Sequence, residues 1–382
     1  MTLAIPLSVN RTYRIAVSVF FFIAGFVFAS WASRIPDIKN QLQLSDGGLG
    51  SVLLALPMGL MTGLPLAGFL VSRFGSKKIM IAGALLYPSI LLLLGLAATP
   101  FQLAAALFMF GFCGNLLNIA VNTQAIGVEA IYGRSIMASF HGLWSLAGFS
   151  GAAVSTIMLS FKLTPFEHFV IISIASTLLI FTAYKYTLPQ DNGNAQQPLF
   201  AKPDKAVLKL GLIVFGCLVC EGTMFDWSGV YFDKVLNVPA SYRTLGYIAF
   251  MSSMASGRFV ADWLVTKFSV KHMLQASGII IAIGLLTAVI FPFIIPATIG
   301  FLLVGIGVSS VVPLTYGQAG KSTTMSPGAA LAALSTVGFL GFLLGPPLIG
   351  FIAQLAGLRW SFTVIALLGL STTVLASKMK MD

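Results

Sequence analysis

Charged residues are scarce in this sequence. Only 9% of the 382 residues are charged, against about 25% in an ordinary soluble domain, and 57% are hydrophobic. This composition excludes a soluble globular protein. Because a helix needs roughly 20 apolar residues to cross a bilayer, the chain is long enough for twelve crossings with short connections between them.

Cysteines are few, and motifs of catalysis are absent. Cys113, Cys217 and Cys220 lie inside apolar segments, which excludes an exported disulfide framework. Cys217 and Cys220 form a CxxC without polar surroundings or a second ligand pair, so we expect buried packing rather than a redox or zinc site. The sequence has no Walker loop, HExxH, GxSxG or dinucleotide fingerprint. It therefore predicts no enzyme, no cofactor and no metal.

Apolar runs bounded by charges or by Pro and Gly predict an all-α polytopic membrane protein. Twelve transmembrane helices are expected, at residues 15–33, 48–72, 79–97, 102–127, 135–160, 167–187, 207–232, 242–266, 272–292, 296–317, 326–353 and 358–377. Arg11 and Arg14 precede the first run. That run is too long for the core of a signal peptide, so it is expected to remain as the first span.

The positions of the 22 Lys and Arg residues predict the orientation. With a cytoplasmic N-terminus, the inner loops and tails hold fifteen of them, the outer loops hold six, and Arg258 alone lies within a span. The positive-inside rule therefore places both termini in the cytoplasm. The same rule explains the net charge of +11 without a nucleic-acid partner.

A polar stretch and an internal repeat predict two similar halves. The stretch rich in Asn, Gln, Pro and Asp lies midway along the chain, so we expect six-helix bundles at 1–187 and 207–382 joined by a cytoplasmic linker at 188–206. A shift of 194 residues aligns 63–83 with 257–277, with seven of 21 positions identical. Two six-span repeats of this kind are typical of one large class of transporters.

The segment GFLVSRFGSKK, from Gly68 to Lys78, resembles the loop signature of the major facilitator superfamily. The superfamily usually has Asp where this chain has Ser72, and Thr266 is the equivalent residue in the second half. Four further segments resemble the bacterial YbjJ-type branch, which is similar to the fucose permeases: ASWASRIPDI (29–38), SFHGLWSLAGFSGA (139–152), EGTMFDW (221–227) and GFLLGPPLIG (341–350).

The resemblance implies a carrier that works by alternating access, with spans 1, 4, 7 and 10 lining a central cavity. It also implies a gating role for Arg73 in the signature loop, although the missing Asp argues against the usual charge-based cytoplasmic contact. The superfamily usually works as a monomer.

Span four has three amides on one helical face. Asn115, Asn118 and Asn122 occur at intervals of three and four residues. An amide in hydrocarbon is costly unless it is hydrogen-bonded, so this face must meet protein or water. One interpretation is that the amides bind a sugar-like, hydroxyl-rich ligand. The other is that they join helices to one another.

Two carboxyl groups lie within span seven. Glu221 is about 12 residues beyond Lys209, or roughly 18 Å along the helix and near the centre of the bilayer. A carboxyl at that depth is a candidate for proton coupling or substrate contact, and the alternative is a neutral or ion-paired structural group. Asp226 is rotated by about 140° from Glu221, so it is the weaker candidate for proton coupling.

Arg258 is the cation embedded in span eight, and Asp262 lies one turn further along the helix. A static pair between them is the favoured interpretation. The alternatives are that Arg258 binds an anionic ligand or exchanges between Asp262 and Glu221 during transport.

Histidine and aromatic residues complete the set of candidates. His141 and Trp144 in span five, and Trp31 in span one, are candidates for substrate contact, and a gating or packing role for His141 is the alternative to proton transfer. Trp31, Trp227 and Tyr231 are expected near the outer surface, where they are also suited to anchoring at the membrane interface.

These features predict a secondary transporter in a bacterial inner membrane, with a small-molecule substrate, proton coupling by symport and a lipid bilayer around it. The preferred substrate is a small polar organic solute. The alternatives are a proton-coupled export antiporter of amphipathic compounds and, outside solute transport, a lipid-translocating protein or a sensor.

Overall fold

The computed structural model describes residues 7–133, 136–189, 203–322, 324–325 and 327–379. In these ranges the regular structure is entirely helical, and eleven helices are long and apolar enough to cross a membrane. The eleven do not include α10 (Leu245–Lys267), the helix that carries Arg258, although α10 matches the span predicted at 242–266. The predicted all-helical membrane fold is confirmed.

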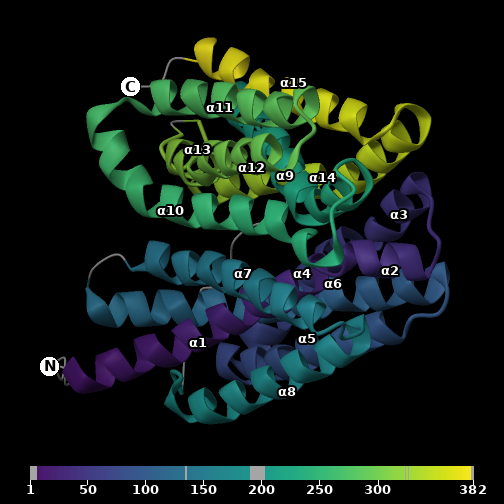
Figure 1. Cartoon of the computed structure of the whole chain (residues 1–382). Coiled ribbons are helices and arrows are strands. Elements are labelled where there is room, and N and C mark those ends of the chain that lie inside the picture. Colours follow the sequence, from purple (N-terminus) through teal and green to yellow (C-terminus); the bar gives the residue numbers. More distant parts are fainter. Residues whose placement is uncertain (1–6, 134–135, 190–202, 323, 326, 380–382) are drawn as a thin grey trace, which may run out of the picture. The chain divides into compact units, whose positions relative to one another are not determined.

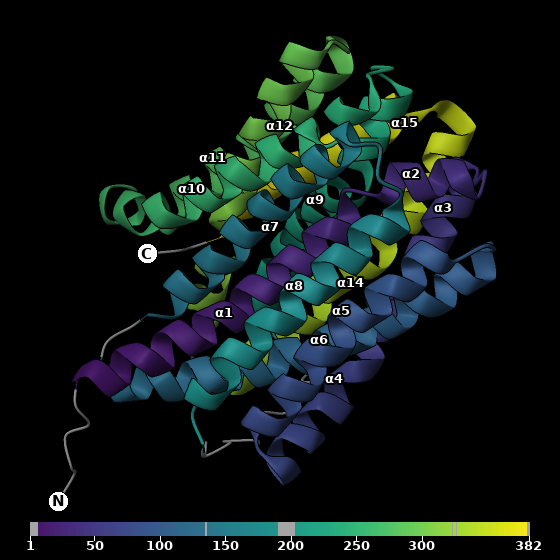
Figure 2. The same cartoon turned by 60° about the horizontal axis from the view of Figure 1, so that its bottom comes forward.

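The first compact unit contains residues 1–34 and 55–195. In it α1 packs against α7 and α8, while α4 and α5 pack against α6 (Figures 1 and 2). Its helices are α1 (Leu7–Ala32), α4 (Ala55–Phe74), α5 (Ser76–Leu96), α6 (Pro100–Tyr132), α7 (Met137–Ser160) and α8 (Pro165–Ala183), with a 3₁₀ turn at Tyr184–Tyr186.

The second compact unit contains residues 35–54 and 196–382. In it α9 packs against α14 and α15, α11 packs against α12 and α15, and α3 packs against α14. Its helices besides α10 are α2 (Ile35–Gln41), α3 (Asp46–Leu53), α9 (Lys205–Lys234), α11 (Val270–Ile290), α12 (Ile294–Ser309), α13 (Val311–Ala319), α14 (Pro327–Ala356) and α15 (Leu358–Ser377), with a 3₁₀ turn at Ala240–Tyr242.

The internal repeat is visible in the helix boundaries. α11 begins and ends 194 residues after α5, which is the shift that aligns the two halves of the sequence. The second-half counterpart of α6 is interrupted, since α12 ends at Ser309 and α13 begins at Val311. Most of the predicted linker, residues 190–202, lies outside the described residues.

Two of the predicted spans are broken, each three residues before a proline. The span at 48–72 is interrupted at Leu54, before Pro57, and the span at 296–317 is interrupted at Ser310, before Pro313. Proline has no N–H group to bond the carbonyl four residues earlier, and its ring clashes with that carbonyl. Each proline therefore removes a helical hydrogen bond at the break. It does not account for the break alone, since α4 continues past Pro65 and α5 past Pro88.

Gly75 makes the tight turn between α4 and α5. Its φ of 84° and ψ of 149° lie in a region that is essentially reserved for glycine. We expect Gly75→Ala to cost about 1–3 kcal/mol of stability, measured as a lower thermal midpoint in detergent. The control is Gly68→Ala on α4. The added Cβ has no atom within 4 Å, so the midpoint should stay unchanged or rise slightly. Equal midpoints for the two variants would contradict this account of the turn.

Candidate functional site

Three amide side chains on α6 form a polar face in the first unit. Asn115 is buried, Asn122 is half-buried and Asn118 is exposed. The Asn122 Nδ2 donates to the Asn118 side-chain oxygen at 2.9 Å and to the Asn118 carbonyl at 2.8 Å. Asn118 and Asn122 are therefore held to each other on their own helix.

These contacts distinguish between the two interpretations of the amides. Among the described residues, no hydrogen bond joins Asn115, Asn118 or Asn122 to another helix, and the buried Asn115 Nδ2 has no partner. A buried donor without a partner costs about 1–3 kcal/mol, so this amide is satisfied only if a water or a ligand reaches it. The arrangement favours a binding role over interhelical hydrogen bonding.

His141 and Trp144 lie on α7 and take part in its contact with α1. His141 is exposed, and its ring meets the ring of Phe21 at a centroid distance of 5.5 Å. The ring centroid of Trp144 lies 6.1 Å from that of Phe28, and its carbonyl occupies the place that a Cβ on Gly25 would need. Close approach of the two helices at this level therefore depends on a glycine in α1.

The aromatic residues expected near the outer surface of the membrane are buried in the protein. Trp31, Trp227 and Tyr231 are each fully buried, so the interpretation that they anchor the chain at the membrane interface is wrong. The Tyr231 hydroxyl donates to the carbonyl of Ala288 at 2.7 Å. The buried Trp31 Nε1 has no hydrogen-bond partner in the described part of the chain.

A buried Arg–His pair was not predicted from the sequence. The Arg34 Nε donates to the His168 Nδ1 at 3.1 Å, and both residues are buried. The bond requires the proton of a neutral imidazole to be on Nε2. The two residues are 134 positions apart, and neither has a local pattern that indicates its partner, so the sequence carried no signal for this contact.

The second unit brings a carboxylate and a guanidinium together. The Glu221 Oε1 lies 3.5 Å from the Arg258 Nη2, and the side chains are 7% and 21% exposed. The sequence favours a pair between Arg258 and Asp262, but the Asp262 side chain lies outside the described residues, and the ion pair that the structure gives is with Glu221. Asp226 is half-buried, without an ion pair to another described side chain.

The break between α12 and α13 lies beside this ion pair. The Sγ of Cys217, one helical turn before Glu221, is 3.9 Å from the carbonyl of Val308. The side chain of Ser309 lies against Gly257, the residue next to the paired arginine. Interrupted helices leave backbone dipoles without helical partners, and in transporters they often contribute to substrate or ion sites.

Arg73 lies exposed at the end of α4. Its guanidinium is 5.9 Å and 5.7 Å from the ring centres of Phe69 and Phe74. No ion pair involves Arg73 among the described residues. Its gating role stays a prediction.

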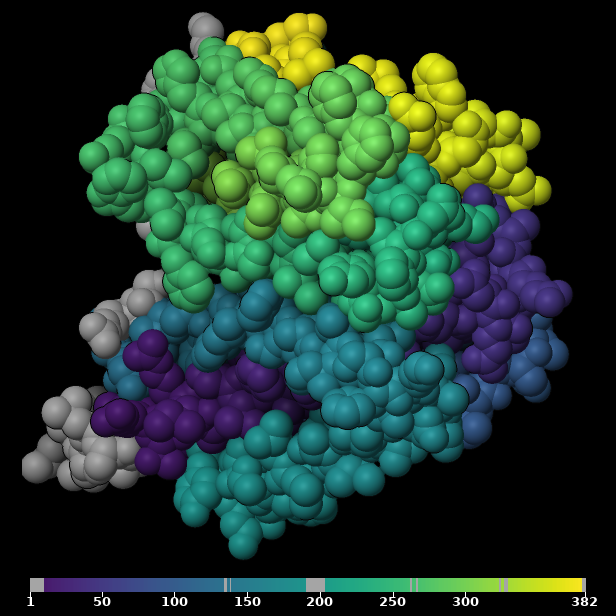
Figure 3. Space-filling model, in the orientation of Figure 1, coloured from purple at the N-terminus to yellow at the C-terminus, as the bar shows by residue number. Residues whose placement is uncertain are grey.

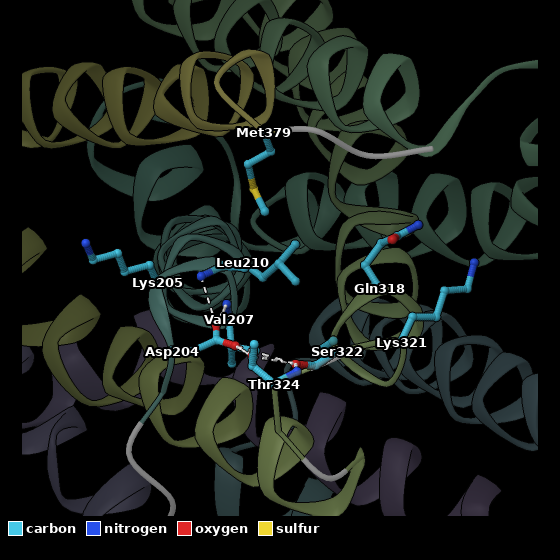
Figure 4. A pocket seen from close by; sticks show the side chains of 11 residues that line it. Asp204, Lys205, Val207, Leu210, Gln318, Lys321, Ser322, Thr324 and Met379 are labelled. Atoms are coloured by element: carbon cyan, nitrogen blue, oxygen red, sulfur yellow. Dashed lines mark hydrogen bonds between the residues drawn. The ribbon is translucent and has the colours of Figure 1, made fainter.

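A further cavity, of about 550 Å³, lies at the start of α9 (Figure 4). Asp204 accepts hydrogen bonds there from the backbone N–H groups of Ala206 and Val207 at 2.8 and 2.7 Å, and from the hydroxyls of Ser322 and Thr324. The hydrogen bond from Thr324 and that from the Val207 N–H hold the pKa of Asp204 below its usual range. An acidic residue directly before an apolar run is a signal for the start of a helix, so this N-cap could have been predicted from the sequence.

The pKa of Asp204 has a consequence for stability. A carboxyl whose pKa is lowered by folding stabilises the folded state above its unfolded pKa of about 3.9, and this contribution is lost as the pH falls through the folded value. Asp204→Ala should therefore cost about 1 kcal/mol near neutral pH. In thermal melts between pH 3 and pH 7, the difference from wild type should shrink toward the acid end. A difference that is constant over this range would contradict the account, and Asp204→Asn should show a smaller loss.

Comparison with known proteins agrees with this fold. The model of the Major Facilitator Superfamily matches residues 16–326. An uncharacterised MFS-type transporter of Yersinia pestis is 36% identical over 95% of this chain and 94% of its own length. An uncharacterised transporter of Sinorhizobium fredii is 30% identical over 95% of this chain and 97% of its own.

Among solved structures, the nucleoside transporter NupG superposes with a TM-score of 0.74 over 96% of this chain and all of its own, at 13% identity. The two proteins therefore share their fold. The chain belongs to the major facilitator superfamily, a family of multi-pass membrane transporters that bind small-molecule substrates and work within a lipid bilayer. It is a transporter rather than an enzyme.

Proposed function

We propose that this protein is a proton-coupled symporter that moves a small polar, hydroxyl-rich organic solute across the cytoplasmic membrane by alternating access. The observation that carries the proposal is the amide face of α6, where the buried Asn115 Nδ2 has no protein partner. An amide offers two donors and an acceptor, which suits a solute with several hydroxyl groups. A sugar-like molecule is the substrate class that fits best.

The role proposed for Glu221 is proton coupling. A carboxyl within a membrane span is costly, so it indicates a function or a charged partner. The Glu221 Oε1 lies 3.5 Å from the Arg258 Nη2. Protonation of Glu221 removes its attraction for the guanidinium, and loss of the proton restores the pair. Such a pair has two discrete states, which a proton-driven cycle requires. Asp226, which has no comparable partner among the described side chains, is proposed as an accessory proton site.

Substrate contacts are proposed from the first unit. Asn115, Asn118 and Asn122 bind the solute, with His141 and Trp144 on the adjoining helix α7 and Trp31 on α1. Trp31 supports this proposal through its buried indole N–H, which lacks a partner among the described residues. Arg258, Asp262 and Arg73 are proposed to act in gating.

The proposed branch, membrane, orientation and domain bounds come from the sequence. We place the chain in the YbjJ-type branch that resembles the fucose permeases, in the inner membrane of a bacterium, with both termini in the cytoplasm and as a monomer. The basic excess of its predicted inner loops supports this orientation. The proposed domains are residues 1–187 and 207–382, with the cytoplasmic linker 188–206 between them.

Thermal stabilisation of the purified protein tests the substrate class. A ligand that binds the folded state raises the unfolding midpoint by mass action, by about 2.7 kcal/mol of stability at 100 times its Kd. Sugars, polyols and nucleosides are compared with amphipathic cations and anions at pH 5.5 and pH 7.5. Stabilisation by hydroxylated solutes supports the symporter. A response to amphipathic compounds only, unchanged in Asn118→Ala, contradicts it and favours the exporter.

A further inference from the structure

A cavity of about 490 Å³ lies in the first unit, where α1, α6 and α7 meet. Its described lining consists of six residues of α1 together with Tyr132 at the end of α6 and Leu143 of α7. All three helices belong to the first unit, so the cavity is formed within that unit. Figure 3 shows the dark purple surface of the first half of α1 exposed.

The charges in this lining are all positive. Arg11 is exposed, Arg14 is half-buried, and the other described lining residues are uncharged. Neither arginine forms an ion pair with a described carboxylate. Glu129, near the end of α6, accepts hydrogen bonds from the backbone N–H groups of Ile136 and Met137 at 2.7 and 2.8 Å. Because like charges three residues apart on a helix repel each other, an anion in the cavity would stabilise this end of α1.

Arg14 is held in place by neutral groups. Its Nη2 donates to the Ser139 Oγ at 3.3 Å, and its guanidinium carbon lies 5.6 Å from the centre of the Tyr132 ring. These contacts order the side chain without neutralising its charge. A cation that served only to orient the chain in the membrane would need no such support. A guanidinium ordered in this way is suited to bidentate hydrogen bonds with a phosphate group.

An apolar stripe leads away from the arginines. Ile15, Val19 and Phe22 follow Arg11 at intervals of four, four and three residues, so they share one face of α1. Leu143 faces the same cavity from α7. At 1.5 Å per residue, the stripe extends about 16 Å along the helix from Arg11 to Phe22. The lining is therefore cationic at one end and mainly apolar beyond it.

We propose that this cavity binds an anionic phospholipid, with the headgroup phosphate between Arg11 and Arg14 and one acyl chain against Ile15, Val19 and Leu143. Basic pockets between transmembrane helices on the cytoplasmic side are sites that anionic headgroups take. The apolar run of α1 begins directly after the two arginines, so their guanidinium groups lie at the depth of the lipid phosphates. A free phosphorylated metabolite has the same phosphate but makes no use of the apolar stripe.

Native mass spectrometry of the purified protein in a neutral detergent tests the site. This measurement counts the bound lipids and gives the Kd of the first one. Phosphatidylglycerol should bind at least tenfold more tightly than phosphatidylcholine with the same acyl chains. Detergent has no sides and the measurement needs no solute, so the result is independent of the proposed transport activity. Only the assignment of the lipid to the inner leaflet rests on the orientation proposed above.

Loss of the two arginines should weaken the binding. At about fivefold for each cation, the double variant Arg11→Gln with Arg14→Gln should raise the Kd of the first phosphatidylglycerol roughly 25-fold. The matched control, Lys205→Gln with Lys209→Gln, removes two exposed cations one turn apart on α9 and should leave the Kd within about twofold. An unchanged Kd in the arginine variant would overturn the proposal. An equal rise in both variants would overturn it as well, because it would show a general attraction to the net charge.

The apolar stripe distinguishes a lipid from a free phosphate. Ile15 is 55% exposed, so Ile15→Ser should leave the fold intact, as thermal melts check, and should raise the Kd about three- to fivefold. Ile174→Ser is the matched control, on α8 of the same unit and 57% exposed, and should leave the Kd unchanged. Glycerol phosphate carries the charge without the chains. If it displaced phosphatidylglycerol at equal concentration, the ligand would be a free phosphorylated metabolite and the proposal would be wrong.

Discussion

Glu221→Gln should abolish concentrative uptake. Glutamine has nearly the same shape as protonated glutamate but cannot release a proton, so the variant stays in one state of the Glu221–Arg258 pair. A gradient of about two pH units supplies roughly 100-fold accumulation to a carrier that moves one proton per solute. In reconstituted vesicles, wild type should approach that accumulation, and the variant should only equilibrate the solute.

The comparison for this variant is Asp226→Asn, at the proposed accessory proton site. It makes the same chemical change five residues away, at a half-buried carboxyl without an ion pair among the described side chains, and it should lower the accumulation less than Glu221→Gln does. Exchange of labelled for unlabelled solute needs no net proton movement, so Glu221→Gln should retain it. Full accumulation in Glu221→Gln would show that Glu221 does not couple transport to protons.

Asn115→Leu should weaken substrate binding while leaving the fold at least as stable. Leucine has a similar volume and removes a buried donor that has no protein partner, so unfolding should become harder by up to about 1 kcal/mol. The solute should lose one or two hydrogen bonds, and its Kd should rise about 10- to 100-fold. Thermal melts with and without ligand measure both quantities in one experiment.

The two readouts separate a binding role from a structural one. If Asn115 held helices together, Asn115→Leu would lower the midpoint of the ligand-free protein, and that result would contradict the binding interpretation. Thr123→Val is the matched control, because the Thr123 hydroxyl bonds the Ile119 carbonyl of its own helix at 2.9 Å. It should change neither the midpoint nor the affinity by a comparable amount.

Much of the fold was predictable from local sequence. Long apolar runs bounded by charges predicted helices close to the observed bounds. The prediction works because a segment that crosses the bilayer must hydrogen-bond its own backbone N–H and C=O groups, which a helix does. The breaks at Leu54 and Ser310 were not predicted, although Pro57 and Pro313 carried the signal for them. The turn at Gly75 lies within the signature loop, where the resemblance already placed a connection.

The contacts between distant residues were not predictable. Arg34 and His168 meet because two helices pack, and no spacing within either helix indicates that. A local i, i+4 rule favoured Asp262 as the partner of Arg258, and this pair stays a prediction because the Asp262 side chain lies outside the described residues. The packing of α9 on α10, which no local rule indicates, brings Glu221 to the guanidinium. The position of residues 35–54 in the second unit also depends on pairs such as Asp37 with Arg243, which are 206 positions apart. Such choices depend on tertiary structure, which a single sequence does not specify.

Solute-driven proton movement in vesicles tests the central claim most directly. Vesicles containing the purified protein and an internal pH dye receive a stabilising solute from the ligand panel, without an imposed gradient. Proton-coupled symport predicts acidification of the interior on addition of the solute, and no acidification in Glu221→Gln vesicles or in empty ones. Entry of labelled solute without any change in internal pH would contradict the account.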